Sequence, residues 1–234
     1  MAIKQRAMAV EDKEERHNAI LDAAEALFLE HPDRMANVSE VAETAGVAKG
    51  TVYLYFPSKE EMLLALHERH VGLFFDELTA LLDRPGSLDF DEVFAVPRKH
   101  IIRGPGYLPL TSICFGLMDR EIALERALEF KVRVGQMLAA AGGRLERHFP
   151  GLGPGDGIAL LCNSYGLMVG MWQLLNPNKR LGAALERPEL RMFRVDYERE
   201  VESALRALWA GTLARNSAAA SAKVPSTKRK GKRK

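Results

Sequence analysis

Residues 37–56 constrain the fold more than any other part of this chain. In the sequence NVSEVAETAGVAKGTVYLYF, the Asn37 side chain can accept hydrogen bonds from first-turn amides, and Glu40 can reach back to the Asn37 amide. This capping pair predicts a short helix over 38–45. Gly46 then tolerates the left-handed backbone of a sharp turn. The stretch therefore predicts two short helices joined by a tight turn, the second starting directly after it.

The second helix is expected to present polar and aromatic side chains on its outer side, because Val52 and Phe56 fall on its inner side. No acid occurs over residues 45–59, although residues 1–60 carry 7 Lys and Arg against 11 Asp and Glu. Lysines, hydroxyl donors and a glycine that permits close backbone approach suit a phosphate-lined groove. The predicted DNA-contacting residues are Asn37, Ala48, Lys49, Gly50, Thr51, Tyr53, Tyr55 and Lys59.

This stretch resembles the DNA-binding region of the tetracycline-repressor (TetR) family. The pattern A-x-x-A-G-V-x-x-G-T-x-Y-x-Y-F-x-x-K lies over residues 42–59, and I-x-x-A-A-x-x-L-F lies over residues 20–28. The close resemblance covers residues 14–74. It implies an all-α protein, with an N-terminal three-helix helix-turn-helix DNA-binding domain and a larger C-terminal helical domain for ligand binding and dimerisation.

The expected organisation follows from this resemblance and from apolar periodicity. We expect an N-terminal arm over 1–13, the DNA-binding domain over 14–74 and the ligand-binding and dimerisation domain over 75–215. Helices are predicted over 11–30, 59–83, 89–103, 108–118, 120–148, 158–175 and 189–215. Pro97 is expected to kink or shorten the helix over 89–103. No alternating β-branched run of strand length competes with them.

The last 19 residues, 216–234, form a basic tail with seven Lys and Arg and no acid. Their composition predicts disorder, because too little apolar surface is available to order them. Such a tail would attract duplex DNA without reading bases, or would only solubilise the chain.

The last two predicted helices could join two copies of the chain. Gly166 and Gly170, four residues apart, permit close helix approach, and the TetR family builds its dimer from the last two helices. The expected interface residues are Gly166, Gly170, Tyr197, Val201, Leu205, Leu208 and Trp209. The alternative is that these residues of the last two helices complete the hydrophobic core of a single chain.

The resemblance implies a homodimeric transcription regulator, most simply a repressor, that binds a pseudo-palindromic operator in double-stranded DNA and is released by a small molecule. Apolar and soft side chains of the middle helices are the candidate pocket, although each could be plain core. They are Phe94, Ile101, Tyr107, Cys114, Phe115, Met118, Met137, Met168, Met171 and Trp172. These residues favour an apolar or aromatic inducer.

Other classes of function find little support in the sequence. His67 and His70 are not part of an HExxH pattern, and no GxSxG elbow occurs, so neither a metal, a cofactor nor an enzyme is expected. A redox-responsive regulator using Cys114 and Cys162 is the alternative, but both lie in apolar runs and are expected to be inert core thiols. Without a signal peptide a cytoplasmic location is expected, and the run over 158–175 is expected to be a buried helix rather than a membrane span.

Overall fold

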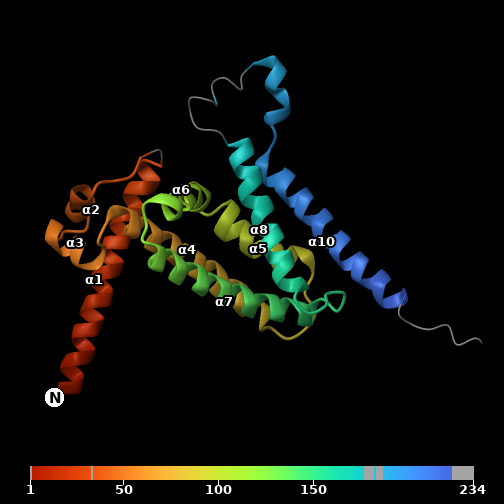
Figure 1. Ribbon diagram of the computed structural model, residues 1–234, viewed down its shortest axis with the longest axis horizontal. Coiled ribbons are helices and arrows are strands. Elements are labelled where there is room, and N and C mark those ends of the chain that lie inside the picture. The colour runs from red at the N-terminus through yellow and green to blue at the C-terminus, as the bar shows by residue number, and fades with distance from the viewer. Residues whose placement is uncertain (1, 33, 177–181, 183–186, 223–234) are drawn as a thin grey trace, which may run out of the picture. The chain divides into compact units, whose positions relative to one another are not determined.

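The computed structural model in Figure 1 describes residues 2–32, 34–176, 182 and 187–222. Side chains are described over 12–215, apart from the same internal gaps. All regular secondary structure in this part of the chain is helical. This confirms the all-α prediction.

The chain divides into two compact units. Unit 1 comprises Met1–Leu78 and Phe94–Met137, and unit 2 comprises Thr79–Val93 and Leu138–Lys234. The expected boundary between residues 74 and 75 does not coincide with this division, because three helices contribute to both units. They are α4 (Lys59–Leu82), α5 (Phe90–Pro97) and α7 (Leu124–His148).

Unit 1 begins with α1 (Ala2–Glu30), followed by α2 (Val38–Thr44) and α3 (Lys49–Tyr55). Helix α1 already starts at Ala2, so the separate arm expected over 1–13 is absent from the structure. Residues 2–13 contain neither Gly nor Pro and are rich in strong helix formers, which explains the continuous helix.

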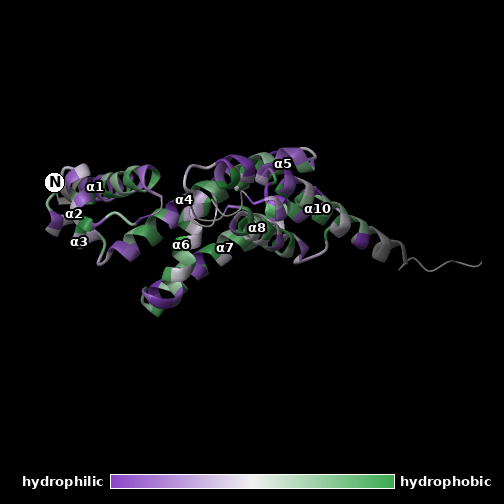
Figure 2. Ribbon diagram, turned by 90° about the horizontal axis from the view of Figure 1, so that it is seen from above, coloured by the Kyte–Doolittle hydropathy of each residue, from purple (hydrophilic) through white to green (hydrophobic). Residues whose placement is uncertain are grey.

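The first three helices of unit 1 share a small core. Ile20 and Phe28 of α1, Val41 of α2 and Val52 of α3 are all buried. Helix α2 contacts both α1 and α3. The two sequence patterns thus meet in one hydrophobic cluster, and Figure 2 shows hydrophilic and hydrophobic segments alternating along these amphipathic helices.

The middle helices follow the predicted pattern with shifted ends. Asp89 and Glu92 form a capping box, with amide-to-carboxylate distances of 2.9 and 3.0 Å, before α5. Pro97 ends α5, and a π-helical segment, η1 (Arg98–Ile102), follows it. Proline cannot donate a helical hydrogen bond, so the helix expected over 89–103 is shortened at Pro97, as the sequence predicted, and a second segment follows.

Helix α6 (Tyr107–Arg120) and α7 are separated by a break at residues 121–123. The helix expected to begin at residue 120 therefore begins at Leu124 instead. The paired glycines Gly142 and Gly143 do not interrupt α7, because α8 (Asp156–Leu175) packs directly against Gly142.

In unit 2, α8 and α10 (Tyr197–Ala222) run side by side (Figure 1). The Tyr197 hydroxyl donates to the Met168 carbonyl at 2.8 Å, and Trp209 Nε1 donates to Ser164 Oγ at 3.0 Å. A short 3₁₀ helix, η2 (Pro188–Phe193), precedes α10. The expected single helix from residue 189 is therefore wrong, because Asp196 caps a new helix by accepting from the Arg199 amide at 3.1 Å.

The apolar side of α10, formed by Val201, Leu205 and Trp209, completes the core of unit 2. Val201, Leu205 and Trp209 are buried within the single chain, and the Trp209 ring lies 5.5 Å from the rings of Phe90 and Phe149. These three side chains are therefore not available as a surface for a second copy, contrary to the expectation. Tyr197 and Leu208 are half-buried.

Helix α10 continues to Ala222, so residues 216–222 of the expected disordered tail are helical. Four alanines over this stretch favour helix. The rest of the predicted basic tail, residues 223–234, lies outside the described residues.

One side of α8 is exposed, and the expectation of a buried helix is wrong. By length and composition alone α8 could cross a membrane, but only 22% of its apolar window is buried within the chain. We call its exposed side the α8 face; it includes Ala159, Cys162, Asn163, Gly166, Gly170 and Leu174.

The contact between α7 and α8 gives a stability prediction. A Cβ added at Gly142 would lie 2.7 Å from the Ile158 backbone nitrogen, whereas one added at Gly143 would meet nothing within 4 Å. Gly142→Ala should lower the free energy of unfolding by about 1–3 kcal/mol through overpacking. Gly143→Ala, the matched control, should raise it by up to about 1 kcal/mol through helix propensity. Urea unfolding at equal protein concentration measures both, and equal effects would contradict the packing argument.

Candidate nucleic-acid interface

The start of α2 is fixed by the predicted capping box. Asn37 Oδ1 accepts from the amides of Ser39 at 2.9 Å and Glu40 at 3.1 Å, and Glu40 Oε2 accepts from the Asn37 amide at 2.8 Å. Arg34 donates to the same carboxylate at 2.9 Å. The Arg34 guanidinium, and next the Asn37 amide, hold the pKa of Glu40 below its usual range. The carboxylate thus stays charged and in place.

The turn between α2 and α3 also follows the sequence prediction. Gly46 has φ +67°, and the Val47 amide donates to the Ala42 carbonyl at 2.9 Å. Ala48 is extended and α3 begins at Lys49. Val52 is buried, and Phe56 is buried with its ring 4.9 Å from the His17 ring of α1. These contacts fix which side of α3 faces outward.

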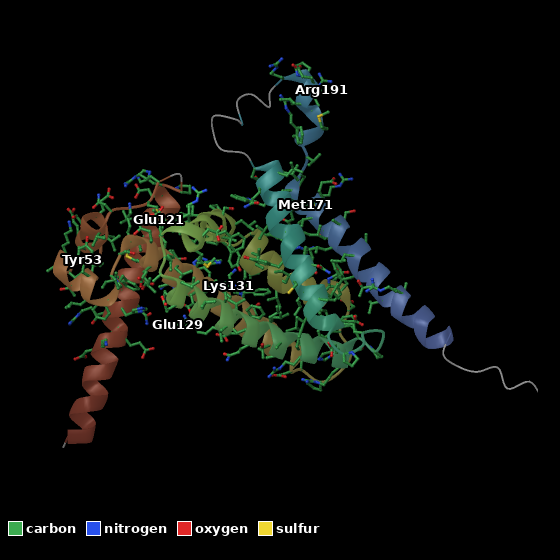
Figure 3. All side chains as sticks on the ribbon, viewed as in Figure 1. Tyr53, Glu121, Glu129, Lys131, Met171 and Arg191 are labelled. Atoms are coloured by element: carbon green, nitrogen blue, oxygen red, sulfur yellow. The ribbon has the colours of Figure 1, made fainter. Side chains whose placement is uncertain are left out.

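Three helix segments meet around a surface hollow, which we call the α2–α3–α4 depression. It is lined by Asn37, Val38, Ser39, Lys49, Tyr53, Pro57, Ser58, Lys59 and Glu60. Tyr53 lies on the outer side of α3 (Figure 3) and is 47% exposed. Ser58 Oγ accepts from the Glu61 amide at 3.1 Å and so caps α4.

The charges around this depression favour an anion. The amino ends of α2 and of the 24-residue α4 carry partial positive charge, and Lys49 and Lys59 add two full charges. Glu60 offsets part of this, with its carboxylate 3.6 Å from Lys59 Nζ. The arrangement can hold a phosphate of a nucleic-acid backbone.

The eight predicted contact residues do not all lie together. Asn37, Lys49, Tyr53 and Lys59 line the depression. Ala48 and Gly50 are exposed beside it, and Thr51 is half-buried.

Tyr55 departs from the expected outward position. It is half-buried, with its ring 6.2 Å from the His17 ring, because it lies on the side of α3 that packs toward α1.

Leu54 was not among the predicted contact residues, because no large apolar side chain was considered as a contact. It is 83% exposed on α3. The helical period could have found it, because residue 54 lies opposite the midpoint between Val52 and Phe56.

The two histidines on α4 have separate surroundings. His67 is buried between the rings of Tyr107 and Phe130, and burial, then His70 and Lys131, lowers its pKa to about 3. His70 instead bonds Glu25 at 2.6 Å. Among the described residues no group of three or more His, Cys, Asp or Glu is placed to hold a metal ion.

The two cysteines also differ. Cys114 is buried in unit 1, donates to the Leu63 carbonyl at 3.6 Å, and burial raises its pKa to about 12. Cys162 is exposed on the α8 face, so the expectation of a core thiol is wrong for this residue.

The candidate pocket residues are divided between the units. Phe94, Ile101, Tyr107 and Cys114 are buried in unit 1, where Phe115, Met118 and Met137 are half-buried. In unit 2, Met168 is buried, and Met171 and Trp172 are half-buried.

Two family models together match most of the chain. Residues 20–66 match "Bacterial regulatory proteins, tetR family", and residues 68–216 match "Tetracyclin repressor-like, C-terminal domain". The first model covers α2, α3 and the start of α4, which line the depression.

Curated relatives are similar over part of the chain. The Fatty acid metabolism regulator protein of Bacillus subtilis is 36% identical over 69 residues, which are 30% of this chain and 36% of that protein. The HTH-type transcriptional regulator EthR of Mycobacterium tuberculosis is 36% identical over 81 residues, 35% of this chain and 38% of that protein. The matches thus span little more than a third of these relatives.

The fold is also found in a crystal structure described as that of a transcriptional regulator from Pseudomonas aeruginosa PAO1. The likeness has a TM-score of 0.59 at 18% identity and covers 86% of this chain and 92% of that one. At this identity the likeness concerns the fold alone.

The capping box gives a second stability prediction. Asn37→Ala should lower the free energy of unfolding by about 1 kcal/mol, because two first-turn amides lose their acceptor. Asn37→Asp, the matched control, keeps an acceptor and should leave stability nearly unchanged. Urea unfolding of both variants measures the difference. Equal stabilities of the two would show that the cap contributes nothing.

Proposed function

Because the chain belongs to the TetR family of bacterial regulatory proteins, we propose that it is a dimeric transcription regulator that binds a pseudo-palindromic operator in double-stranded DNA. It acts in the cytoplasm as a repressor, and a small molecule releases it. The observation that carries this proposal is the α2–α3–α4 depression, where Lys49, Lys59 and the amino end of α4 surround Tyr53.

Helix α3 enters the major groove, and the depression receives a backbone phosphate beside it. Lys49 and Lys59 neutralise the phosphate, and the Tyr53 hydroxyl and the amides at the start of α4 donate to it. Gly50 supports this docking, because it is exposed and has no atom within 4 Å of an added Cβ. The backbone of α3 can therefore approach the DNA closely.

The inducer is an apolar or aromatic molecule that binds among the middle helices. Support comes from the buried and half-buried side chains of α5 and α6 within unit 1, among them Phe94, Phe115 and Met118. One relative is named a fatty acid metabolism regulator, and this agrees with an apolar inducer. Among the candidate lining residues of unit 1, Tyr107 and Cys114 on α6 carry a hydroxyl and a thiol.

Contacts within unit 1 can carry a shift of α6 to the DNA-binding helices. Arg69 of α4 bonds Asp22 at 2.5 Å and also bonds Glu25, and His70 bonds the same glutamate of α1. A Cβ added at Gly106, just before α6, would lie 2.8 Å from the Leu29 side chain of α1.

Helices α1, α4 and α6 are thus joined by polar and close apolar contacts. A ligand that moves α6 or α4 changes the position of α3 with them. By linkage, ligand must weaken DNA binding by the same factor by which DNA weakens ligand binding.

Dimerisation uses the α8 face. The exposed side of this apolar helix is a surface that a partner would bury. Gly166 and Gly170 allow a second helix to approach it closely. Asn163, in the middle of this face, favours a protein partner over lipid. A second copy, related by a two-fold axis, would also supply the second α3 that a pseudo-palindromic operator requires.

The DNA contacts are tested by Lys59→Ala and Tyr53→Ala. Both should weaken binding to the selected operator while leaving the fold intact, because both side chains are exposed. Lys59→Ala should also reduce the slope of log affinity against log salt by about one unit. Lys99→Ala, which removes a lysine paired with Glu77 away from the depression, is the control. Fluorescence anisotropy at several salt concentrations measures all three, and wild-type affinity and slope in both test variants would refute the contacts.

The dimer is tested by Gly170→Arg. An arginine at this exposed position fits the single chain, which has no atom within 4 Å of an added Cβ, but blocks a closely packed partner helix. We expect a monomer at micromolar concentration and at least a tenfold loss of operator affinity. Gly135→Arg, at an equally open glycine of α7, should remain dimeric. Sedimentation measures both, and a dimeric Gly170→Arg variant would contradict the proposed interface.

A further inference from the structure

Leu54 is the most exposed large hydrophobic side chain among the residues whose side chains the structure describes, at 83%. It lies on α3, the helix proposed above to enter the major groove. Single exposed leucines are common on protein surfaces and need no explanation by themselves. This one differs because of its position on the helix and because of its neighbours.

Leu54 marks the outermost point of α3. The buried side of this helix is set by Val52 and Phe56, and at 100° per residue Leu54 points roughly opposite to their mean direction. Gly50, one turn earlier, is exposed and has no side chain to cover it. The Leu54 side chain therefore projects from the side of α3 opposite to its buried residues.

At 83% exposure, Leu54 is largely uncovered by the residues that the structure describes, while polar groups stand beside it. Lys49 and Tyr53 lie on the adjoining side of the helix and line the depression. With phosphates held by these groups, Leu54 faces the base edges between them. An apolar tip flanked by phosphate-binding groups is therefore directed at the floor of the groove.

The chemistry of the major-groove edges indicates which base the Leu54 side chain can contact favourably. Guanine, adenine and cytosine present hydrogen-bonding atoms there, whereas thymine adds a 5-methyl group. A leucine over a donor or acceptor would remove its water without replacing the hydrogen bond, which is unfavourable. Over a thymine methyl the same leucine buries apolar surface on both sides.

We propose that Leu54 is a specificity-determining residue that reads a thymine in each operator half-site through its 5-methyl group. This inference rests on the proposed DNA-binding function. Burial of one methyl group corresponds to about a threefold to fourfold change in affinity. Two symmetric half-sites together give about tenfold.

The test replaces thymine by deoxyuridine, which lacks only the 5-methyl group. Operator DNA is first selected from a random pool with the full-length protein. Each thymine is then replaced in both half-sites at once, and affinity is measured by fluorescence anisotropy. We expect about a tenfold loss for the wild type at one symmetric pair, and no difference between thymine and deoxyuridine there for Leu54→Ala.

A matched control distinguishes loss of the thymine preference at Leu54 from an effect of replacing any exposed leucine. Leu73, on α4, is 54% exposed, and Leu73→Ala should keep the full difference between thymine and deoxyuridine. Leu54→Ala should also keep the wild-type salt slope, because it removes no phosphate contact.

Two results would overturn the inference while the DNA-binding function stands. One is wild-type binding that no deoxyuridine substitution weakens, and the other is a thymine preference that persists in Leu54→Ala. If the selection enriches no DNA at all, the proposed function fails and the reading of thymine fails with it.

Discussion

The burial of Val52 and Phe56 is the constraint on which the DNA-facing surface depends. Helix α3 has only seven residues and could not hold its orientation alone. Its inner side is fixed by these two residues, with Phe56 against His17 of α1, and its start is fixed by the turn at Gly46. Once that side is buried, Leu54 must face outward, and Tyr53 lies between the two sides.

The same packing ties the surface to the rest of unit 1. The long helix α4 starts at the depression, where Ser58 caps it, and its side chains Arg69 and His70 reach α1 three turns later. Gly106 brings the start of α6 against α1 as well. The geometry around Lys59 therefore depends on contacts far along the chain, as a regulator that responds to a ligand requires.

Sequence reasoning predicted what depends on local chemistry. The cap at Asn37 and the turn at Gly46 each involve residues only a few positions apart, so their patterns could be recognised in the sequence. Sequence reasoning failed where tertiary packing decides whether a side chain is buried or exposed. The α10 stripe with Trp209 could equally serve a core or a dimer, and only its burial against Phe90 and Phe149 shows the core. Tyr55 was expected to face outward and Leu54 was not considered, because polarity, rather than direction on the helix, was used to choose contacts.

The central claim is that two copies of this chain read DNA through paired α3 helices. The most direct measurement is sequencing of DNA selected from a random pool by the full-length protein. The account predicts an inverted repeat whose half-site centres lie about 10–10.5 base pairs apart, or a multiple of that. Recovery of unrelated sequences, or of a single site without symmetry, would contradict it.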